Sequence, residues 1–206
     1  AHNRGALVLL DAFQSAGALA VDLQALDVDF AVGGMLKYLL GTAGIGWLYV
    51  ARQHLGLTPT ASGWFAQADI DAMDIFANDP APTARRFQTG TPPVVNCYAG
   101  AAGVELIRGI GIGAIETRIG HLTGGAMDQL AAAGCRLATP REDHRRGPQV
   151  AVRSHDAAAL TAKLAERDVV VSWRDGNVRA MFHAYNDASD VDALMEGLMA
   201  HRDLLA

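Results

Sequence analysis

Cysteine and lysine are both scarce in this sequence of 206 residues. The two cysteines, Cys97 and Cys135, lie far apart and belong to no metal-binding spacing. This excludes a disulfide framework and a zinc site, and a reducing cytoplasm is the expected location. Lysine occurs only at positions 37 and 163.

Long hydrophobic runs and basic stretches are also missing. The longest apolar stretch nearly free of charge covers residues 38–51, which is shorter than the roughly 18–20 residues that a membrane span needs. The densest basic patch, at 141–146 (REDHRR), contains two acids, and the net charge is −5. We therefore expect neither a membrane nor a nucleic acid as a partner. Hydrophobic residues make up 50% and charged residues 19%, which favours a packed globular protein over a disordered one.

The first residues include neither a methionine nor a signal-peptide pattern. They run directly into an apolar stretch at 6–10, without a leading helix. We therefore expect the chain to begin inside a domain.

Three short strands are predicted in the first quarter of the chain. The runs at 6–10 (ALVLL) and 28–32 (VDFAV) lack alternation, which favours strands buried on both faces of a parallel sheet. The run at 45–50 (IGWLYV) is rich in β-branched and aromatic residues. A loop or short helix at 16–27 joins the first two strands, and this alternation indicates an α/β fold.

The rest of the chain is predicted to contain loops, two long helices and a second small layer. Turn residues fill 56–93. Helices are expected at 96–110 and 114–133, on either side of a glycine-rich break. The pattern then predicts strand, helix, strand, strand and helix at 149–153, 156–167, 169–173, 178–183 and 189–205. Asp156 is suited to cap the first helix of this group, and the order indicates an α+β layer with its helices on one face.

Lys37 follows a buried-strand pattern and has apolar neighbours on both sides, in GGMLKYLLG. Desolvation favours a neutral amine, which is the form that attacks an aldehyde to give a Schiff base. The alternative is an ordinary lysine at a strand end whose amine reaches water. Lys163 lies on a predicted amphipathic helix and is expected to be exposed.

Asp11 ends the first predicted strand, where α/β sheets bind their ligands. A carboxylate there can hold a protonated pyridine nitrogen by a charge-assisted hydrogen bond. It could also be a simple cap for the following turn. A short crossover joins the strand of Asp11 to the strand before Lys37, which places both side chains on one edge of a sheet and favours a shared site.

The stretch from Asp11 to Lys37 resembles the class V aminotransferases, fold type I enzymes that use pyridoxal 5'-phosphate (PLP). The family includes cysteine desulfurases, kynureninase and isopenicillin N epimerase. RRFQTGTPPV resembles the family's Gly-Thr-Pro element, and GNVRAMFHAYNDASDVDAL its C-terminal signature. ASGWF is most similar to kynureninase. The motifs occur in the family's order and cover nearly the whole chain.

The resemblance implies a role for each matching residue. Lys37 would be the Schiff-base lysine, Asp11 would bind the pyridine nitrogen, and Gln14 the ring hydroxyl oxygen. Trp64 would contribute to the cofactor site.

The resemblance also implies a homodimer, in which Thr91 reaches the phosphate of the cofactor bound by the partner subunit. Arg179 would bind the substrate carboxylate, for which a planar guanidinium is suited.

Several positions depart from the family pattern. The segment 172–177 (SWRDGN) has no cysteine, and Leu36 stands where desulfurases usually carry histidine, so persulfide chemistry is not expected. Kynureninases usually carry tyrosine before the lysine and histidine where Gln14 stands, which argues against strict kynureninase activity. Gly34 and Met35 replace a phosphate-binding serine or threonine.

We therefore expect an aminotransferase acting on an amino acid. A PLP lyase of the kynureninase or desulfurase branch and an epimerase are alternatives, as is an interaction protein that keeps the fold without the cofactor. Residues 1–93 would be the second half of a large PLP-binding domain, 94–120 a connecting helix and 121–206 a small α+β domain. In this family the phosphate-binding turn and the ring-stacking aromatic residue precede the aspartate. The 206 residues alone are thus expected to bind PLP poorly and to be inactive.

Other motifs are weaker. GIGIGA at 109–114 matches a loose dinucleotide-binding pattern but follows a predicted helix rather than a strand. The seven histidines show no metal-binding spacing. No Gly-x-Ser-x-Gly element is present. We therefore expect no metal site.

Overall fold

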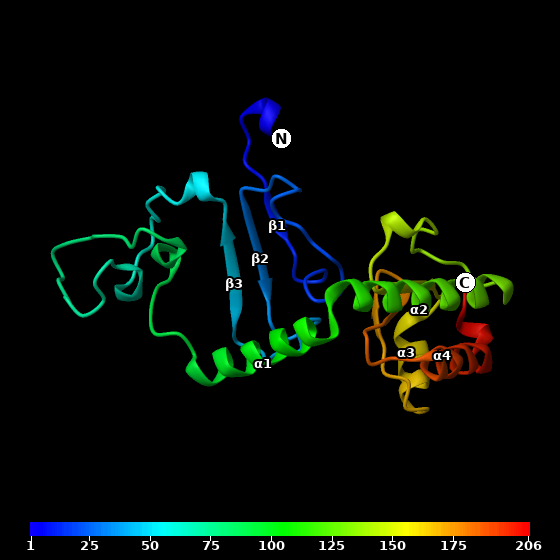
Figure 1. The fold of residues 1–206 in the computed structure, drawn as a ribbon. Coiled ribbons are helices and arrows are strands. Elements are labelled where there is room, and N and C mark those ends of the chain that lie inside the picture. The colour runs from blue at the N-terminus through cyan, green and yellow to red at the C-terminus, as the bar shows by residue number, and fades with distance from the viewer. The chain divides into compact units, whose positions relative to one another are not determined.

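The computed structural model describes residues 1–206, which divide into two compact units (Figure 1). The first unit contains Ala1–Gly17 and Val21–Gly109, and the second contains Ala18–Ala20 and Ile110–Ala206. The division falls inside the range 94–120, which the sequence assigned to one connecting helix.

Two helices meet at this division. α1 (Val94–Ile110) and α2 (Ile112–Ala132) are interrupted by Gly111. Gly111 has φ 91°, in the left-handed region that glycine adopts without steric cost, and it therefore ends the helical path. Both helices match the predicted ranges to within two residues.

A mixed three-stranded sheet of order β1-β2-β3 forms the centre of the first unit. β1 (Leu9–Asp11) runs parallel to β2 (Phe30–Gly34), with Asp11 opposite Val32. β3 (Gly46–Val50) is antiparallel to β2.

The prediction that residues 6–10 form a strand buried on both faces is wrong for this chain. The side chains of Leu7 and Leu9 are 57% and 62% exposed, so the faces of the sheet are not covered at these positions, and the strand itself spans only Leu9–Asp11. Residues 16–27 form turns, which is the loop alternative of the prediction.

Short 3-10 helices punctuate the remainder of the first unit. These are η1 (His2–Arg4), η2 (Arg52–His54), η3 (Trp64–Ala66) and η4 (Ala84–Phe87). The segment 56–93 lies beyond β3, on the side of the sheet away from β1 (Figure 1).

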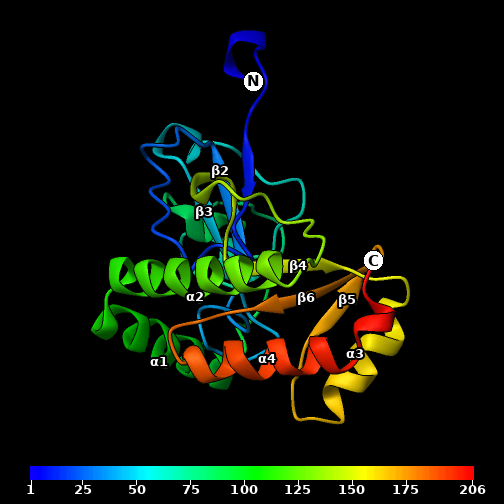
Figure 2. The ribbon, with the colours of Figure 1, turned by 90° about the vertical axis from the view of Figure 1, so that its right-hand side faces the viewer.

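The second unit is an antiparallel sheet with helices on one face (Figure 2). Its strands β4 (Gln149–Arg153), β6 (Asn177–Met181) and β5 (Ser172–Arg174) follow the order β4-β6-β5. Its other helices are α3 (Ala157–Ala165), α4 (Ala188–Ala200) and the short η5 (Asp143–Arg145) and η6 (Arg202–Leu204).

One sheet face and three helices share the hydrophobic core of the second unit. Val150, Val152, Val178 and Ala180 point from β4 and β6 to the same side and pack with α2, α3 and α4. Asp156 caps α3, because its side chain accepts a hydrogen bond from the Ala159 amide. The predicted helix cap and one-faced layer are confirmed.

Two boundaries in the second unit differ from prediction. β5 begins at Ser172 rather than Val169, because its pairing with β6 begins at Ser172, opposite Arg179. The last helix ends at Ala200 rather than Leu205. The chain then turns so that the Leu204 carbonyl accepts hydrogen bonds from Ser154 and His155.

No single helix has both the length and the hydropathy of a membrane span. α1 and α2 meet that composition only when they are taken together across the break at Gly111.

Candidate active site

Asp11 and Lys37 emerge at the same edge of the first sheet. Asp11 is the last residue of β1, and Lys37 follows the end of β2 by three residues. Because β1 and β2 are parallel, their carboxyl ends lie side by side, at the edge where α/β sheets bind ligands.

A phenylalanine connects these two residues. The Phe13 amide donates a hydrogen bond to Asp11 Oδ1 at 2.9 Å, and Lys37 Nζ lies 4.8 Å from the centroid of the Phe13 ring. Gln14 follows in the same turn and is exposed. The structure therefore brings Asp11, Gln14 and Lys37 to one small region, and it adds Phe13, for which the sequence predicted no role.

Lys37 is exposed, which matches the alternative of a strand-end lysine whose amine reaches water and not that of a desolvated amine. Its neighbour Tyr38 points inward and is 8% exposed. The turn is closed by bonds from the Leu40 amide to the Lys37 carbonyl and from the Gly41 amide to the Met35 carbonyl. Lys37 itself points outward over Phe13.

Helix α1 packs directly on this turn. A Cβ at Gly103 would overlap the Leu39 carbonyl, and a Cβ at Gly41 would lie 3.1 Å from the Cα of Gly100. These glycines let two backbones approach closely, which holds the Lys37 turn against a helix.

Trp64 and Thr91 lie in a second region of the first unit, within the segment 56–93. Trp64 is 40% exposed and packs edge-to-face on Phe65 at 4.5 Å between ring centroids. The Phe65 amide donates to the Thr89 carbonyl at 3.3 Å, which joins the turn of Trp64 to the extended segment leading to Thr91. Thr91 is exposed.

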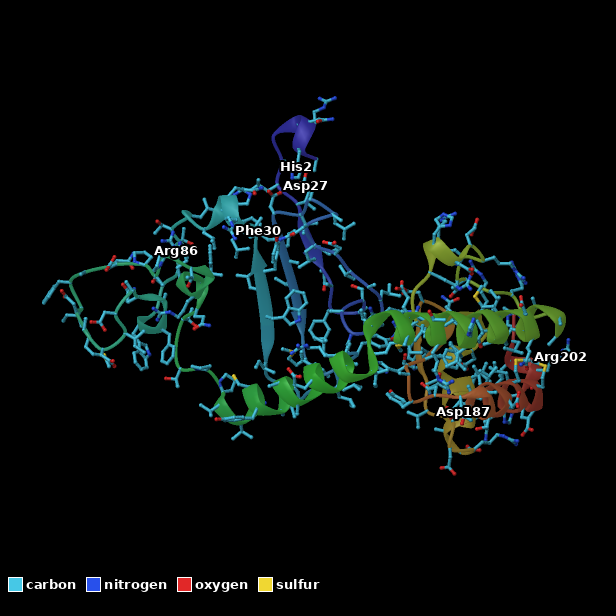
Figure 3. The ribbon with its side chains drawn as sticks, in the orientation of Figure 1. His2, Asp27, Phe30, Arg86, Asp187 and Arg202 are labelled. Atoms are coloured by element: carbon cyan, nitrogen blue, oxygen red, sulfur yellow. The ribbon has the colours of Figure 1, made fainter.

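Two arginines hold this second region together. Arg85 donates to the carbonyls of Phe65 and Ala68, each at 3.0 Å. Arg86 donates to the carbonyls of Ala81 and Leu57 at 2.7 and 2.9 Å and is labelled in Figure 3. Backbone carbonyls thus occupy donors of both guanidinium groups.

Arg179 belongs to β6 of the second unit. Its Nη2 donates to Ser172 Oγ at 3.1 Å, and its Nε is buried without a hydrogen-bond partner. A buried guanidinium N–H without a partner is costly, so an incoming acceptor would be favoured here. The segment 172–177, which precedes Arg179, contains no thiol.

The opposite end of the β1–β2 pair carries a cluster that the sequence did not predict. Asp29 is 2% exposed and accepts hydrogen bonds from His2 at 2.8 Å, the Val8 amide at 2.7 Å and His54 at 2.6 Å. These bonds, that of His2 foremost, lower the pKa of Asp29, and the bond to Asp29 raises the pKa of His2. His2, Asp27 and Phe30 mark this end in Figure 3.

A sequence signal for this cluster existed in part. A charged residue inside an apolar run, as Asp29 is in DVDF, is buried only when it is paired. The long separation of His2 and His54 from Asp29 concealed the partners. No three metal-binding side chains are grouped to hold an ion anywhere in the 206 residues.

The chain is similar in sequence to one protein family and to named proteins of several bacteria. The family model described as Aminotransferase class-V matches residues 1–194. A kynureninase of Deinococcus radiodurans is 35% identical over 100% of this chain and 52% of its own length. The Bacillus subtilis protein named uncharacterized aminotransferase YcbU is 32% identical over 97% of this chain and 52% of its own length.

Solved structures give the same result. The apo cysteine desulfurase of Thermococcus onnurineus NA1 superposes with a TM-score of 0.87 at 24% identity, over 98% of this chain and 54% of that one. The cysteine desulfurase CsdA of Escherichia coli superposes with a TM-score of 0.84 at 25% identity, over 100% of this chain and 54% of that one. The predicted resemblance and the fold type I architecture are confirmed, and the chain spans about half the length of the relatives that it matches.

Proposed function

Because the chain belongs to the class V aminotransferase family of PLP-dependent enzymes, we propose that its protein is a PLP-dependent aminotransferase acting on an amino acid, with Lys37 as the lysine that bonds to the cofactor. The observation that carries the proposal is the placement of Lys37 and Asp11 at the adjoining carboxyl ends of β1 and β2. PLP, when bound, withdraws electrons from the substrate Cα through its pyridine ring.

The side chains at this edge fit the polar groups of such a ring, its nitrogen and its hydroxyl. The Phe13 amide occupies Oδ1 of Asp11, which leaves Oδ2 to accept a hydrogen bond from a pyridine N–H. The carboxylate would keep that nitrogen protonated. Gln14, exposed on the same turn, has an amide that can donate to the ring hydroxyl oxygen.

Lys37 would act as the proton carrier. Its amine is exposed at the edge of the sheet, where it would be free to move a proton at the substrate Cα. In its neutral form it would remove the Cα proton, and in its protonated form return one.

Arg179 would bind the substrate carboxylate. Ser172 fixes one guanidinium nitrogen, and the buried Nε still lacks an acceptor, so a carboxylate would satisfy it.

Trp64 and Thr91 support a homodimer. Their segment extends beyond β3, away from the edge strand that ends in Asp11 (Figure 1). From there the Thr91 hydroxyl would donate to the phosphate of the cofactor bound by the partner subunit. We further propose that the homodimer is cytoplasmic, and that these 206 residues need the remainder of the enzyme to bind PLP tightly.

A lyase reaction of the kynureninase type is the second candidate. Trp64 in its GWF element and the 35% identity to a kynureninase favour it. The absence of cysteine from the 172–177 hairpin argues against a persulfide route.

Product analysis separates these reactions. The complete gene product, loaded with PLP, would be incubated with a panel of amino acids, with and without a keto acid acceptor. An aminotransferase consumes the acceptor and forms a new amino acid in equal amount. Release of alanine or sulfide without an acceptor would support a lyase instead, and a protein without PLP absorbance would refute both.

A further inference from the structure

The ring of Phe13 lies between Gly34 and Lys37, and none of the roles above includes this ring. Its ring centroid is 4.8 Å from Lys37 Nζ, inside the distance of about 6 Å at which an ammonium is attracted to an aromatic face. At its tip, the ring occupies the space above Gly34, where a Cβ would overlap Cζ and Cε2.

Two hydrogen bonds also hold the backbone at Phe13 in place. Its amide donates to Asp11 Oδ1, and the preceding Ala12 amide donates to the Val32 carbonyl of β2 at 2.8 Å. Phe13 is thus tied to both parallel strands, and its position is set by the same register that aligns Asp11 with β2.

We propose that Phe13 is a positioning residue for Lys37, and that Gly34 is glycine so that the Phe13 ring can lie there. The inference deepens the proposed function and rests on it. Whenever the Lys37 amine is not bonded to the cofactor, the ring holds it at the carboxyl end of β2. Without the ring, an exposed lysine would sample many rotamers in solvent.

Positions 13 and 34 are therefore coupled. A serine or threonine at 34 would offer a hydroxyl for a phosphate, but its Cβ would push the ring away from Lys37. The chain combines the ring at 13 with glycine at 34. Its phosphate donors must accordingly come from elsewhere.

The contact can be measured without turnover. The complete gene product, free of cofactor, is reductively methylated with ¹³C-formaldehyde, which keeps the lysine charge, and the Lys37 methyl signal is assigned by its loss in Lys37→Arg. Lys163, which is exposed and bound to Glu166 at 3.0 Å, serves as the internal reference. The ring should shift the Lys37 signal upfield of the Lys163 signal.

Variants of Phe13 distinguish the effect of an aromatic ring from that of side-chain volume. Phe13→Leu should move the Lys37 signal to the Lys163 position, whereas Phe13→Tyr should keep the shift. Gly34→Ala should abolish the shift although Phe13 is still present. A Lys37 signal that coincides with that of Lys163 in the unmodified sequence, or one unchanged by Phe13→Leu, would overturn the inference.

Cofactor capture gives an independent readout. We expect Phe13→Leu to slow attachment of PLP to Lys37 roughly two- to fivefold, the range of an exposed cation–π contact, and Phe13→Tyr to restore it. If the unmodified enzyme attaches no PLP through Lys37, the proposed function fails. If it does, but Phe13→Leu matches it in capture rate and in methyl shift, only the role of Phe13 fails.

Discussion

Asp11 and Asp29 lie at opposite ends of the same pair of parallel strands, and their surroundings differ sharply. Asp29 is buried and receives three hydrogen bonds, from two histidines and a backbone amide. Asp11 is exposed and receives one, from the Phe13 amide. No salt bridge joins Asp11 to a basic side chain within 4.0 Å in the 206 residues.

The difference distinguishes a carboxylate that stabilises the fold from one that can bind a ligand. Asp29 has its acceptor capacity used by the protein and links η1, β2 and η2. Asp11 has an oxygen left for a donor from outside. Burial with full pairing points to structure, and exposure beside a reactive amine points to chemistry.

The largest expected effect is on catalysis at the carboxyl ends of β1 and β2, where Asp11 and Lys37 lie. In the complete gene product, Lys37→Ala should reduce turnover by roughly 10²- to 10⁴-fold, because a positioned proton carrier contributes that much. Asp11→Asn should also lose most activity, since an amide cannot stabilise a pyridinium charge. Circular dichroism melting should show little change in either variant, because both side chains are exposed. Full activity in Asp11→Asn would remove the distinction between the two aspartates.

Asp29→Ala should have the opposite profile. It leaves two histidines and the Val8 amide without their common acceptor, so the melting temperature should fall by roughly 5 °C or more. Residual folded enzyme should keep its PLP absorbance per folded molecule. An unchanged melting temperature would show that the cluster does not support the fold.

The stability of the Asp29 cluster should also depend on pH. His2 has a raised pKa, so its contribution to stability is fully present below its unfolded pKa of about 6.5 and is lost as the pH rises through the higher folded value. Asp29 has a lowered pKa, so its contribution is present above about 3.9 and lost only in stronger acid.

The cluster should therefore be tightest between about pH 4 and 6.5 and loosen above that range. Hydrogen exchange at the Val8 amide, corrected for the intrinsic rate, should accelerate as pH rises, and His2→Gln should remove the dependence. Protection that increases with pH would contradict the assigned direction.

The smallest effect provides a matched control for Asp11. Asp156 is also exposed and also accepts one backbone amide at 2.9 Å, as the cap of α3. Asp156→Ala should cost about 1 kcal/mol of unfolding free energy and leave PLP binding unchanged, as measured by urea unfolding and PLP titration. If Asp11→Ala behaved in the same way, Asp11 would be a turn cap and nothing more.

The sequence predicted the parts of the fold that depend on local pattern. Uninterrupted periodicity located α1 and α2, and Asp156 was found because capping is a local interaction. The strand at 6–10 was misjudged in burial, since the burial of its side chains depends on which elements cover the faces of the sheet, and local pattern does not contain that information.

The residues of the site also divide into those that the sequence could predict and those that it could not. Asp11 and Lys37 could be paired from the sequence, because a short parallel crossover brings strand ends together. Phe13 and the Asp29 cluster could not, because they depend on contacts between side chains separated by 24 and more residues in the chain. The exposure of Lys37 could not be decided from the sequence, because its apolar neighbours differ in burial: Tyr38 is 8% exposed and Leu36 is 47% exposed.

The central claim is that Lys37 is the residue that bonds to PLP. The most direct measurement is to load the complete gene product with PLP, reduce it with borohydride and map the labelled peptide by mass spectrometry. We predict the label on Lys37 and none on Lys163, with the labelling lost in Lys37→Arg. A label on a different residue, or an unlabelled protein at saturating PLP, would contradict the account.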